Sequence, residues 1–220
     1  MGQDAEEVKV GFLFDLDGVL IDSERSYSRF WKEVDRVYPT GYDNFDRIIK
    51  GTTLYDILDR YFSDPEVREK VTQLCLELER NIRYGYEKGA HELLRGLKER
   101  GIPVALVTSS DKVKMHNLWL QLPDLRGLLT AVIDAECVTK SKPDPEGYLK
   151  GAAALGVAPE HCVVFEDSLT GVKAGRASGS YVIGMSQTLG ADVVRPYSDE
   201  VHASLEEIDP DALIALLRRR

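Results

Sequence analysis

The stretch VGFLFDLDGVLIDSE, residues 10–24, decides the fold of this chain. An apolar run over residues 10–14 stops at Asp15, a second carboxylate follows at Asp17, and Gly18 leads into another apolar stretch. Four more short runs rich in branched apolar residues occur at 103–107, 128–133, 161–165 and 180–185. Runs of this kind are typical of strands buried on both faces, as in a parallel sheet covered by helices.

The segments between these runs have helical character. Residues 90–101, 144–157 and 167–179 each end at or near a glycine, and 90–101 carries apolar residues at helical spacing. Alternating strands and helices predict an α/β fold, a doubly wound parallel sheet. Residues 208–220 predict a final helix, whose three terminal arginines suit the negative end of the helix dipole.

One interval interrupts this alternation. Between Gly18 and Ala90 the sequence contains no convincing strand, and helices are expected near 23–37, 53–62 and 65–84. The first of these has a mostly i, i+3, i+4, i+7 apolar pattern that includes Tyr27 and Trp31. We therefore expect a helical domain at 22–88, inserted into a catalytic core formed by 1–21 and 89–220.

The composition excludes several classes of protein. A formal net charge of −9 disfavours nonspecific binding to nucleic acid or to an anionic membrane, and no apolar run approaches the roughly 18 residues of a membrane span. The acidic N-terminus lacks the apolar stretch of a signal peptide. Cys75, Cys137 and Cys162 are scattered and odd in number, as expected in a reducing compartment. We expect a cytoplasmic protein with no evident obligate protein partner.

Polar residues gather where the predicted strands end. They are Asp15 and Asp17, the run Thr108-Ser109-Ser110, Lys142, and the pair Glu166-Asp167. An isolated acid at a strand end is usually a helix cap or a solvated turn. Four clusters at the carboxyl edge of one parallel sheet instead predict a ligand site.

These residue types suit phosphoryl transfer. Asp15 can attack phosphorus as a carboxylate nucleophile, and Asp17 can exchange protons with the leaving oxygen and with water. Mg²⁺ would offset the repulsion between carboxylate and phosphate, with Asp167 reaching the metal from a neighbouring strand. Thr108 offers a hydroxyl to a phosphate oxygen, and Lys142 offers a positive charge to the phosphate and to Asp15.

The motifs FDLDGVL, the strand end at Thr108, Lys142 followed by proline, and FEDSLTGVKAG resemble, in order and spacing, the haloacid dehalogenase-like hydrolase superfamily. The resemblance implies a Rossmann-like core with a small α-helical cap inserted after the first strand. It also implies Mg²⁺ held by Asp15, the backbone carbonyl of Asp17, and Asp167, with Glu166 acting through water or as an orienting residue. Within the superfamily the chain is similar to the β-phosphoglucomutase and sugar-phosphatase subgroup, and Asp17 favours phosphate chemistry over dehalogenation.

The resemblance leaves the acceptor of the phosphoryl group open. The mutases carry a histidine twelve residues after the nucleophile, where this chain has Tyr27, and an arginine in a cap loop that here reads KGTTLYD, residues 50–56. Both departures favour a phosphatase acting on a small phosphorylated metabolite, such as a sugar phosphate. In this family cap residues set specificity, and the candidates for substrate binding are Ser109, Thr52, Thr53 and Tyr27, with Lys50 and Arg80 as further cap candidates.

Three alternatives remain from the sequence. The first is a sugar phosphomutase, and the second is another activity of the superfamily, including phosphonate cleavage. The third is a catalytically silent binding or regulatory protein on the same fold. Retention of Asp15, Asp17, Thr108, Lys142 and Asp167 disfavours this last alternative.

Overall fold

The core of the molecule is a six-stranded sheet. The computed structural model describes residues 8–220. All strands are parallel, in the order β3-β2-β1-β4-β5-β6. Their bounds are β1 Gly11–Phe14, β2 Val104–Val107, β3 Ala131–Ile133, β4 Cys162–Glu166, β5 Tyr181–Met185 and β6 Glu200–His202. The doubly wound parallel fold predicted from the sequence is confirmed.

Both faces of the sheet are buried, as the unbroken apolar runs predict. Phe12 and Phe14 point to one face, where the rings of Phe14 and Phe165 stack with centroids 4.4 Å apart, and Leu13 points to the other. Helices α5 (Ala90–Glu99), α6 (Lys112–Gln121), α7 (Leu125–Leu128) and α11 (Pro210–Leu217) contribute side chains to the first face. Helices α8 (Glu146–Leu155), α9 (Leu169–Ala177) and α10 (Ala191–Val194) contribute to the second.

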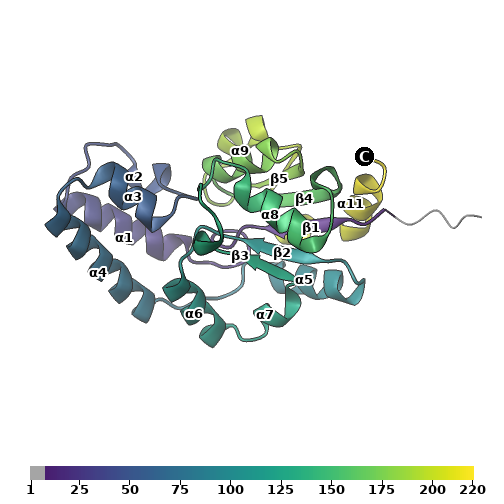
Figure 1. The fold of residues 1–220 in the computed structure, drawn as a ribbon, viewed down its shortest axis with the longest axis horizontal. Coiled ribbons are helices and arrows are strands. Elements are labelled where there is room, and N and C mark those ends of the chain that lie inside the picture. Colours follow the sequence, from purple (N-terminus) through teal and green to yellow (C-terminus); the bar gives the residue numbers. More distant parts are fainter. Residues whose placement is uncertain (1–7) are drawn as a thin grey trace, which may run out of the picture.

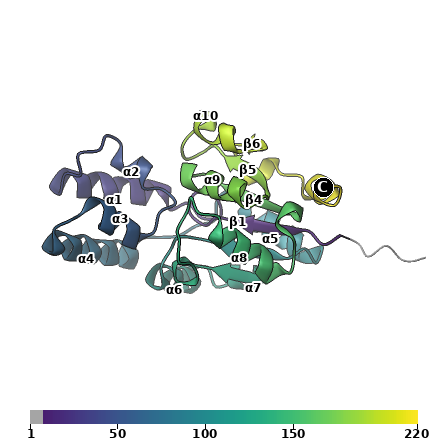
Figure 2. The ribbon, with the colours of Figure 1, turned by 45° about the horizontal axis from the view of Figure 1, so that its top comes forward.

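Four helices form a separate lobe beside the core (Figures 1 and 2). They are α1 (Glu24–Val37), α2 (Phe45–Ile48), α3 (Leu54–Tyr61) and α4 (Pro65–Asn81), and they pack around their own apolar cluster. The ring of Phe45 lies at the centre of this cluster and meets Trp31, Tyr61 and Phe62 edge-on. This grouping supports the proposed division into a core and a cap at residues 22–88.

The structure departs from the sequence-based expectation in several elements. Strand β6 and helices α2, α7 and α10 were not predicted. Helix α4 ends at Asn81 rather than at residue 84, because Ile82 is extended and begins the return to the core. The strand expected at 128–133 covers only 131–133, since its first residue belongs to α7.

Short 3₁₀ helices complete the core: η1 Ala135–Cys137, η2 Pro159–His161, η3 Arg195–Tyr197 and η4 Leu205–Glu207. Within residues 8–220, every helix is too short or too polar to cross a membrane. The part of the expected core at residues 1–7, including the acidic N-terminus, lies outside the described residues.

Candidate active site

The opening motif places its two acids at the centre of the carboxyl edge of the sheet. β1 lies between β2 and β4, and the Asp15 amide donates to the carbonyl of Phe165, 3.0 Å away. The chain then turns sharply through Gly18, whose φ is +73°. A Cβ at this position would lie 2.1 Å from Asp167 Oδ2, so only glycine permits both the turn and this close approach.

Three buried carboxylates meet at this edge. Ligand atoms of Asp15, Glu166 and Asp167 lie within 4.8 Å of one another. Asp167 Oδ2 is buried and has no hydrogen-bond partner within the described part of the chain. Burial, and then the charges of Asp15 and Glu166, raise the pKa of Asp167 well above its usual range. A concentration of negative charge with an orphaned carboxylate oxygen fits a hard divalent cation such as Mg²⁺.

Lys142 supplies the positive charge nearest to this cluster. Its Nζ donates to Asp15 Oδ1 and to Glu166 Oε1, both at 2.5 Å, and to the Val107 carbonyl at 3.2 Å. Burial alone would lower the pKa of Lys142, but the charges of Asp15 and Glu166 raise it overall. Burial, together with the charges of Glu166 and Asp17, raises the pKa of Asp15 to about 7. Lys142 lowers this pKa but offsets only part of the increase. The site therefore holds more negative charge than Lys142 can balance.

Both carboxylate oxygens of Glu166 accept several hydrogen bonds. Its Oε1 accepts from Lys142 and from the Tyr148 hydroxyl, and its Oε2 accepts from the amides of Asp167 and Ser168 and from the Ser168 hydroxyl. These bonds favour the orienting role for Glu166 over direct metal ligation. The Asp17 carboxylate lies outside the three-acid cluster, which agrees with an expected contribution through its backbone carbonyl.

Thr108 stands at the end of β2, buried and facing the same edge. Its Oγ1 donates to Ser110 Oγ at 2.9 Å and accepts from the Ser110 amide at 3.1 Å. Thr108, Ser109 and Ser110 all line the cavity above Asp15. The structure therefore brings the hydroxyl run next to the nucleophile candidate.

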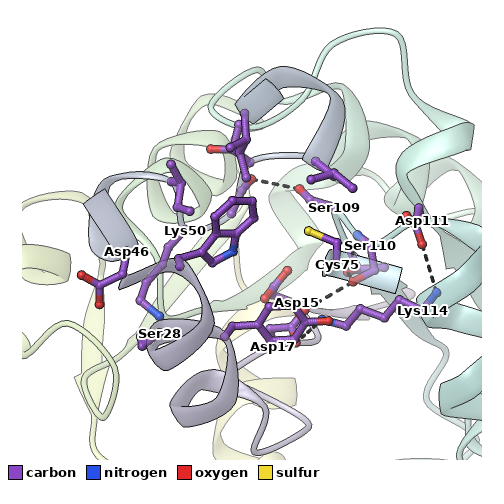
Figure 3. Close-up of a pocket in the computed structure, with 18 of the residues that line it drawn as sticks. Asp15, Asp17, Ser28, Asp46, Lys50, Cys75, Ser109, Ser110, Asp111 and Lys114 are labelled. Atoms are coloured by element: carbon purple, nitrogen blue, oxygen red, sulfur yellow. Dashed lines mark hydrogen bonds and ion pairs between the residues drawn. The ribbon is translucent and has the colours of Figure 1, made fainter. Parts of the chain in front are cut away.

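A cavity of about 150 Å³ lies between Asp15 and the cap (Figure 3). Among the substrate-binding candidates, Tyr27, Thr52 and Ser109 line it. Thr53 does not, because its hydroxyl caps α3 through the Asp56 amide at 3.1 Å. Arg80 is exposed and also lies outside the lining. The cap lining is partly apolar, from Trp31, Ile49, Leu54 and Ile57, and partly polar, from Ser28, Asp46, Lys50 and Glu79.

Two hydrogen bonds hold the cap loop at residues 50–51 against the core. Ser109 Oγ donates to the Gly51 carbonyl at 2.9 Å, and Thr170 Oγ1 donates to the Lys50 carbonyl at 2.7 Å. A Cβ on Gly51 would lie 2.4 Å from Thr170 Oγ1. The cap loop therefore approaches the core closely enough to cover the cavity.

Sequence reasoning missed Lys114, a buried cation of the site. The Nζ of Lys114, in the first turn of α6, lies 2.5 Å from Asp17 Oδ1, and its side chain is only 9% exposed. Burial alone would raise the pKa of Asp17, but Lys114 and hydrogen bonds from Ser23 and Ser110 lower it overall. The available signal was Asp111, a helix-capping residue after β2, which accepts from the Lys114 amide at 3.0 Å.

The chain is similar to known proteins in sequence and in fold. The family model described as haloacid dehalogenase-like hydrolase matches residues 10–179. The chain belongs to the haloacid dehalogenase-like hydrolase family.

Individual relatives are similar over most of the chain. Hexitol phosphatase A of Escherichia coli (strain K12) is 34% identical over 207 residues, which cover 90% of this chain and 92% of the relative. Validoxylamine A 7'-phosphate phosphatase of Streptomyces hygroscopicus subsp. limoneus is 30% identical, over 83% of this chain and 88% of the relative. In fold, the chain is similar to the crystal structure of β-phosphoglucomutase from Clostridium difficile, with a TM-score of 0.79, 22% identity, and coverage of 96% and 98%.

Proposed function

We propose that this chain is a Mg²⁺-dependent phosphatase that hydrolyses the phosphate monoester of a sugar or polyol through an aspartyl-phosphate on Asp15. The observation that carries the proposal is the convergence of Asp15, Lys142, Thr108 and the three-acid cluster beneath a covered cavity. The phosphatases among the relatives confirm the expected enzyme class, phosphoric monoester hydrolases.

The reaction proceeds in two displacements. In the first, an Asp15 carboxylate oxygen bonds to phosphorus while the ester P–O bond breaks, and the leaving oxygen takes up a proton, for which Asp17 is the candidate donor. In the second, the oxygen of water bonds to phosphorus, the Asp15–phosphorus bond breaks, and Asp17 accepts the proton of that water. Asp15 is regenerated, and the products are the free alcohol and inorganic phosphate.

Asp15, Asp167 and the Asp17 carbonyl would hold the metal, which would neutralise charge between the carboxylates and the incoming phosphate. Lys142 contributes fixed positive charge beside Asp15, and Glu166 holds Lys142 in place through its own hydrogen bond. Thr108 and Ser109 line the cavity beside Asp15. Their hydroxyls would donate to phosphate oxygens in place of their acceptors in the free protein, Ser110 Oγ and the Gly51 carbonyl. The cap excludes water and contacts the remainder of the substrate, through Tyr27 and Thr52 among the candidates.

A sugar phosphomutase is the second candidate function. We consider it because the fold is similar to that of β-phosphoglucomutase. The cap loop at 50–56 lines the cavity with Lys50, Gly51, Thr52 and Leu54 and with no arginine. Tyr27 lines it where the mutases have histidine. Water needs no such cap groups to act as the second acceptor. These residues favour the phosphatase.

The test is a screen of hexitol, hexose, pentose and glycerol phosphates and p-nitrophenyl phosphate with Mg²⁺, scored for free phosphate. An isomerisation assay with added sugar bisphosphate runs beside it. We expect phosphate release that EDTA abolishes and that exceeds isomerisation. Faster isomerisation would favour the mutase, and inactivity over the whole panel would favour the non-catalytic alternative.

Asp15→Asn supplies the matched variant. The amide has nearly the same shape but is a poor nucleophile, so turnover should fall by about 10³-fold or more while thermal unfolding stays cooperative. Phosphate release by this variant at more than a few per cent of the wild-type rate would remove Asp15 from the role of nucleophile.

A further inference from the structure

The surroundings of Lys114 disfavour a positively charged side chain. It lies in the first turn of α6, where the positive end of the helix dipole disfavours a cation. Its side chain is also almost completely removed from water. A buried ammonium is retained only with close partners, because its lost hydration must be replaced.

The partner of Lys114 is Asp17. Nζ donates to Asp17 Oδ1 at 2.5 Å, and the same Nζ lies 4.0 Å from the centroid of the Tyr27 ring and 6.0 Å from that of Tyr84. The faces of the two aromatic rings attract the ammonium through cation–π interactions, which are not ion pairs. Glu79, which also lines the cavity, accepts instead from the Tyr84 hydroxyl at 2.5 Å.

Donors from three separate segments hold the Asp17 carboxylate. Ser23, just before α1, donates to Oδ1, and Ser110, after β2, donates to Oδ2 at 3.3 Å. Lys114 is the charged member of the three, and charge-assisted bonds are the strongest of this kind. Figure 3 shows Lys114 reaching Asp17 beside the cavity.

The position of Asp17 matters because of its neighbours. Asp15, only two residues away, belongs to the three-acid cluster, whereas the Asp17 carboxylate does not. An acid drawn into that cluster would be occupied by the cation and lost for proton transfer. The Lys114 ammonium, which lines the cavity together with Asp17, holds the Asp17 carboxylate away from the cluster and on the cavity side.

We propose that Lys114 is a positioning residue that holds the Asp17 carboxylate beside the cavity, so that Asp17 can accept the proton of the water that hydrolyses the aspartyl-phosphate. This role rests on the proposed phosphatase function. Lys114 itself forms and breaks no bond. It acts only through the orientation of Asp17, and its effect therefore belongs to the second displacement.

The test is Lys114→Met, assayed with p-nitrophenyl phosphate and Mg²⁺. The p-nitrophenolate leaving group needs no proton, so kcat/KM, which reports the first displacement, should stay within about threefold of wild type. The second displacement should slow, so kcat should fall by about tenfold or more. A burst of about one p-nitrophenolate per active site should appear, and acid-quenched protein should show the phosphoenzyme by intact mass spectrometry.

Two further variants sharpen this test. Lys112→Met removes a lysine of the same helix whose side chain is 74% exposed and pairs with Glu136, and it should behave as wild type. Lys114→Arg keeps a charged donor and should retain more of kcat than Lys114→Met.

Equal losses of kcat and kcat/KM in Lys114→Met without a burst would overturn the proposal, because they would indicate a structural defect or a role in the first step. Behaviour like that of Lys112→Met would also overturn it, as would failure of both Lys114 variants to fold. A wild-type protein inactive over the whole panel would overturn the phosphatase function itself and this role with it. An active wild type with an unaffected Lys114→Met would overturn only the role of Lys114.

Discussion

Asp15, Asp17 and Asp167 have the same functional group, but each carboxylate has different neighbours. Asp15 has a lysine and two acids close by, Asp17 has a lysine and two hydroxyls, and one oxygen of Asp167 has no partner within the described residues. Burial and like charge raise the pKa of Asp15 and Asp167, whereas Lys114 and the hydroxyls lower that of Asp17. The three carboxylates therefore differ in their electrostatic environment although they have the same functional group.

The buried carboxylate of Asp167 leads to a prediction about stability. Without a divalent cation its buried charge opposes folding, so Asp167→Asn should raise the Tm measured in EDTA. Each kcal/mol of relief corresponds to about 2–4 °C in a chain of this size. The stabilisation by Mg²⁺ that we expect for the wild type should be lost in this variant, because the amide is a weaker ligand.

Thermal unfolding with EDTA and with a Mg²⁺ series checks this prediction. Asp59→Asn, at a side chain that is 64% exposed, is the control and should change neither quantity. An unchanged Mg²⁺ response in Asp167→Asn would exclude Asp167 as a ligand.

At the scale of elements, α8 organises the loop that presents Lys142. The Glu146 carboxylate, in the first turn of α8, accepts from the Thr139 amide at 3.1 Å, the Lys140 amide at 2.8 Å and Lys150 Nζ at 2.6 Å. Hydrogen bonds from Lys150 and Thr139 are the main reason that the pKa of Glu146 falls to about 2. One acid thus holds the chain two residues before Lys142.

This arrangement predicts a pH-dependent contribution to stability. The folded pKa of Glu146 is about 2 and its ordinary value is 4.5, so its contribution is complete above about pH 4.5 and is lost as the pH falls toward 2. Glu146→Gln should therefore be modestly less stable than wild type at pH 7, and the difference should shrink below pH 4.5.

Urea unfolding at pH 7, 5, 4 and 3 measures the difference between the two proteins. Glu99→Gln, at a side chain that is 69% exposed and pairs with Arg95, is the control for loss of a surface charge. A difference independent of pH would show that the Glu146 contacts act through shape and not through charge.

At the scale of the whole molecule, two bodies with separate apolar clusters enclose the cavity. The cap cluster around Phe45 shares no buried member with the two clusters of the sheet. The cap loop reaches the core at Gly51, whose φ is +73° and whose missing side chain leaves room for Ser168 and Thr170. Closure over the active site thus depends on a backbone contact.

Gly51→Ala should push the cap loop off the core. We expect KM to rise by about tenfold, with a smaller fall in kcat, because water exclusion and substrate contacts weaken together. Global stability should fall by only about 1–2 kcal/mol, the cost of a left-handed alanine, since neither body loses its apolar cluster.

Gly41→Ala is the matched control, because Gly41 has φ of +80° but no atom within 4 Å of the added Cβ. Steady-state kinetics and thermal unfolding of both variants separate backbone strain from the clash. Equal KM values for the two variants would contradict a role of Gly51 in closure.

Much of this molecule could be predicted from local patterns. Strands buried on both faces require unbroken apolar runs, and parallel strands require helices between them, so the alternation over residues 10–24 and 90–185 predicted the doubly wound fold. Because parallel strands share a carboxyl edge, the positions of Asp15, Thr108, Lys142 and Asp167 at strand ends were enough to predict that they converge. Short elements with weak patterns, such as β6 and α10, were not predictable in this way.

The sequence by itself determined the fold class, the edge of the sheet that carries the site, and the acids and the lysine that gather there. These depend on periodicity and on strand ends, which are properties of neighbours along the chain. Only the tertiary structure decided that Lys114, 97 residues after Asp17, pairs with it, that Tyr148 and Ser168 saturate Glu166, and that Thr53 caps a helix outside the cavity. Such pairings depend on side-chain direction and on packing between distant segments, which no local pattern encodes.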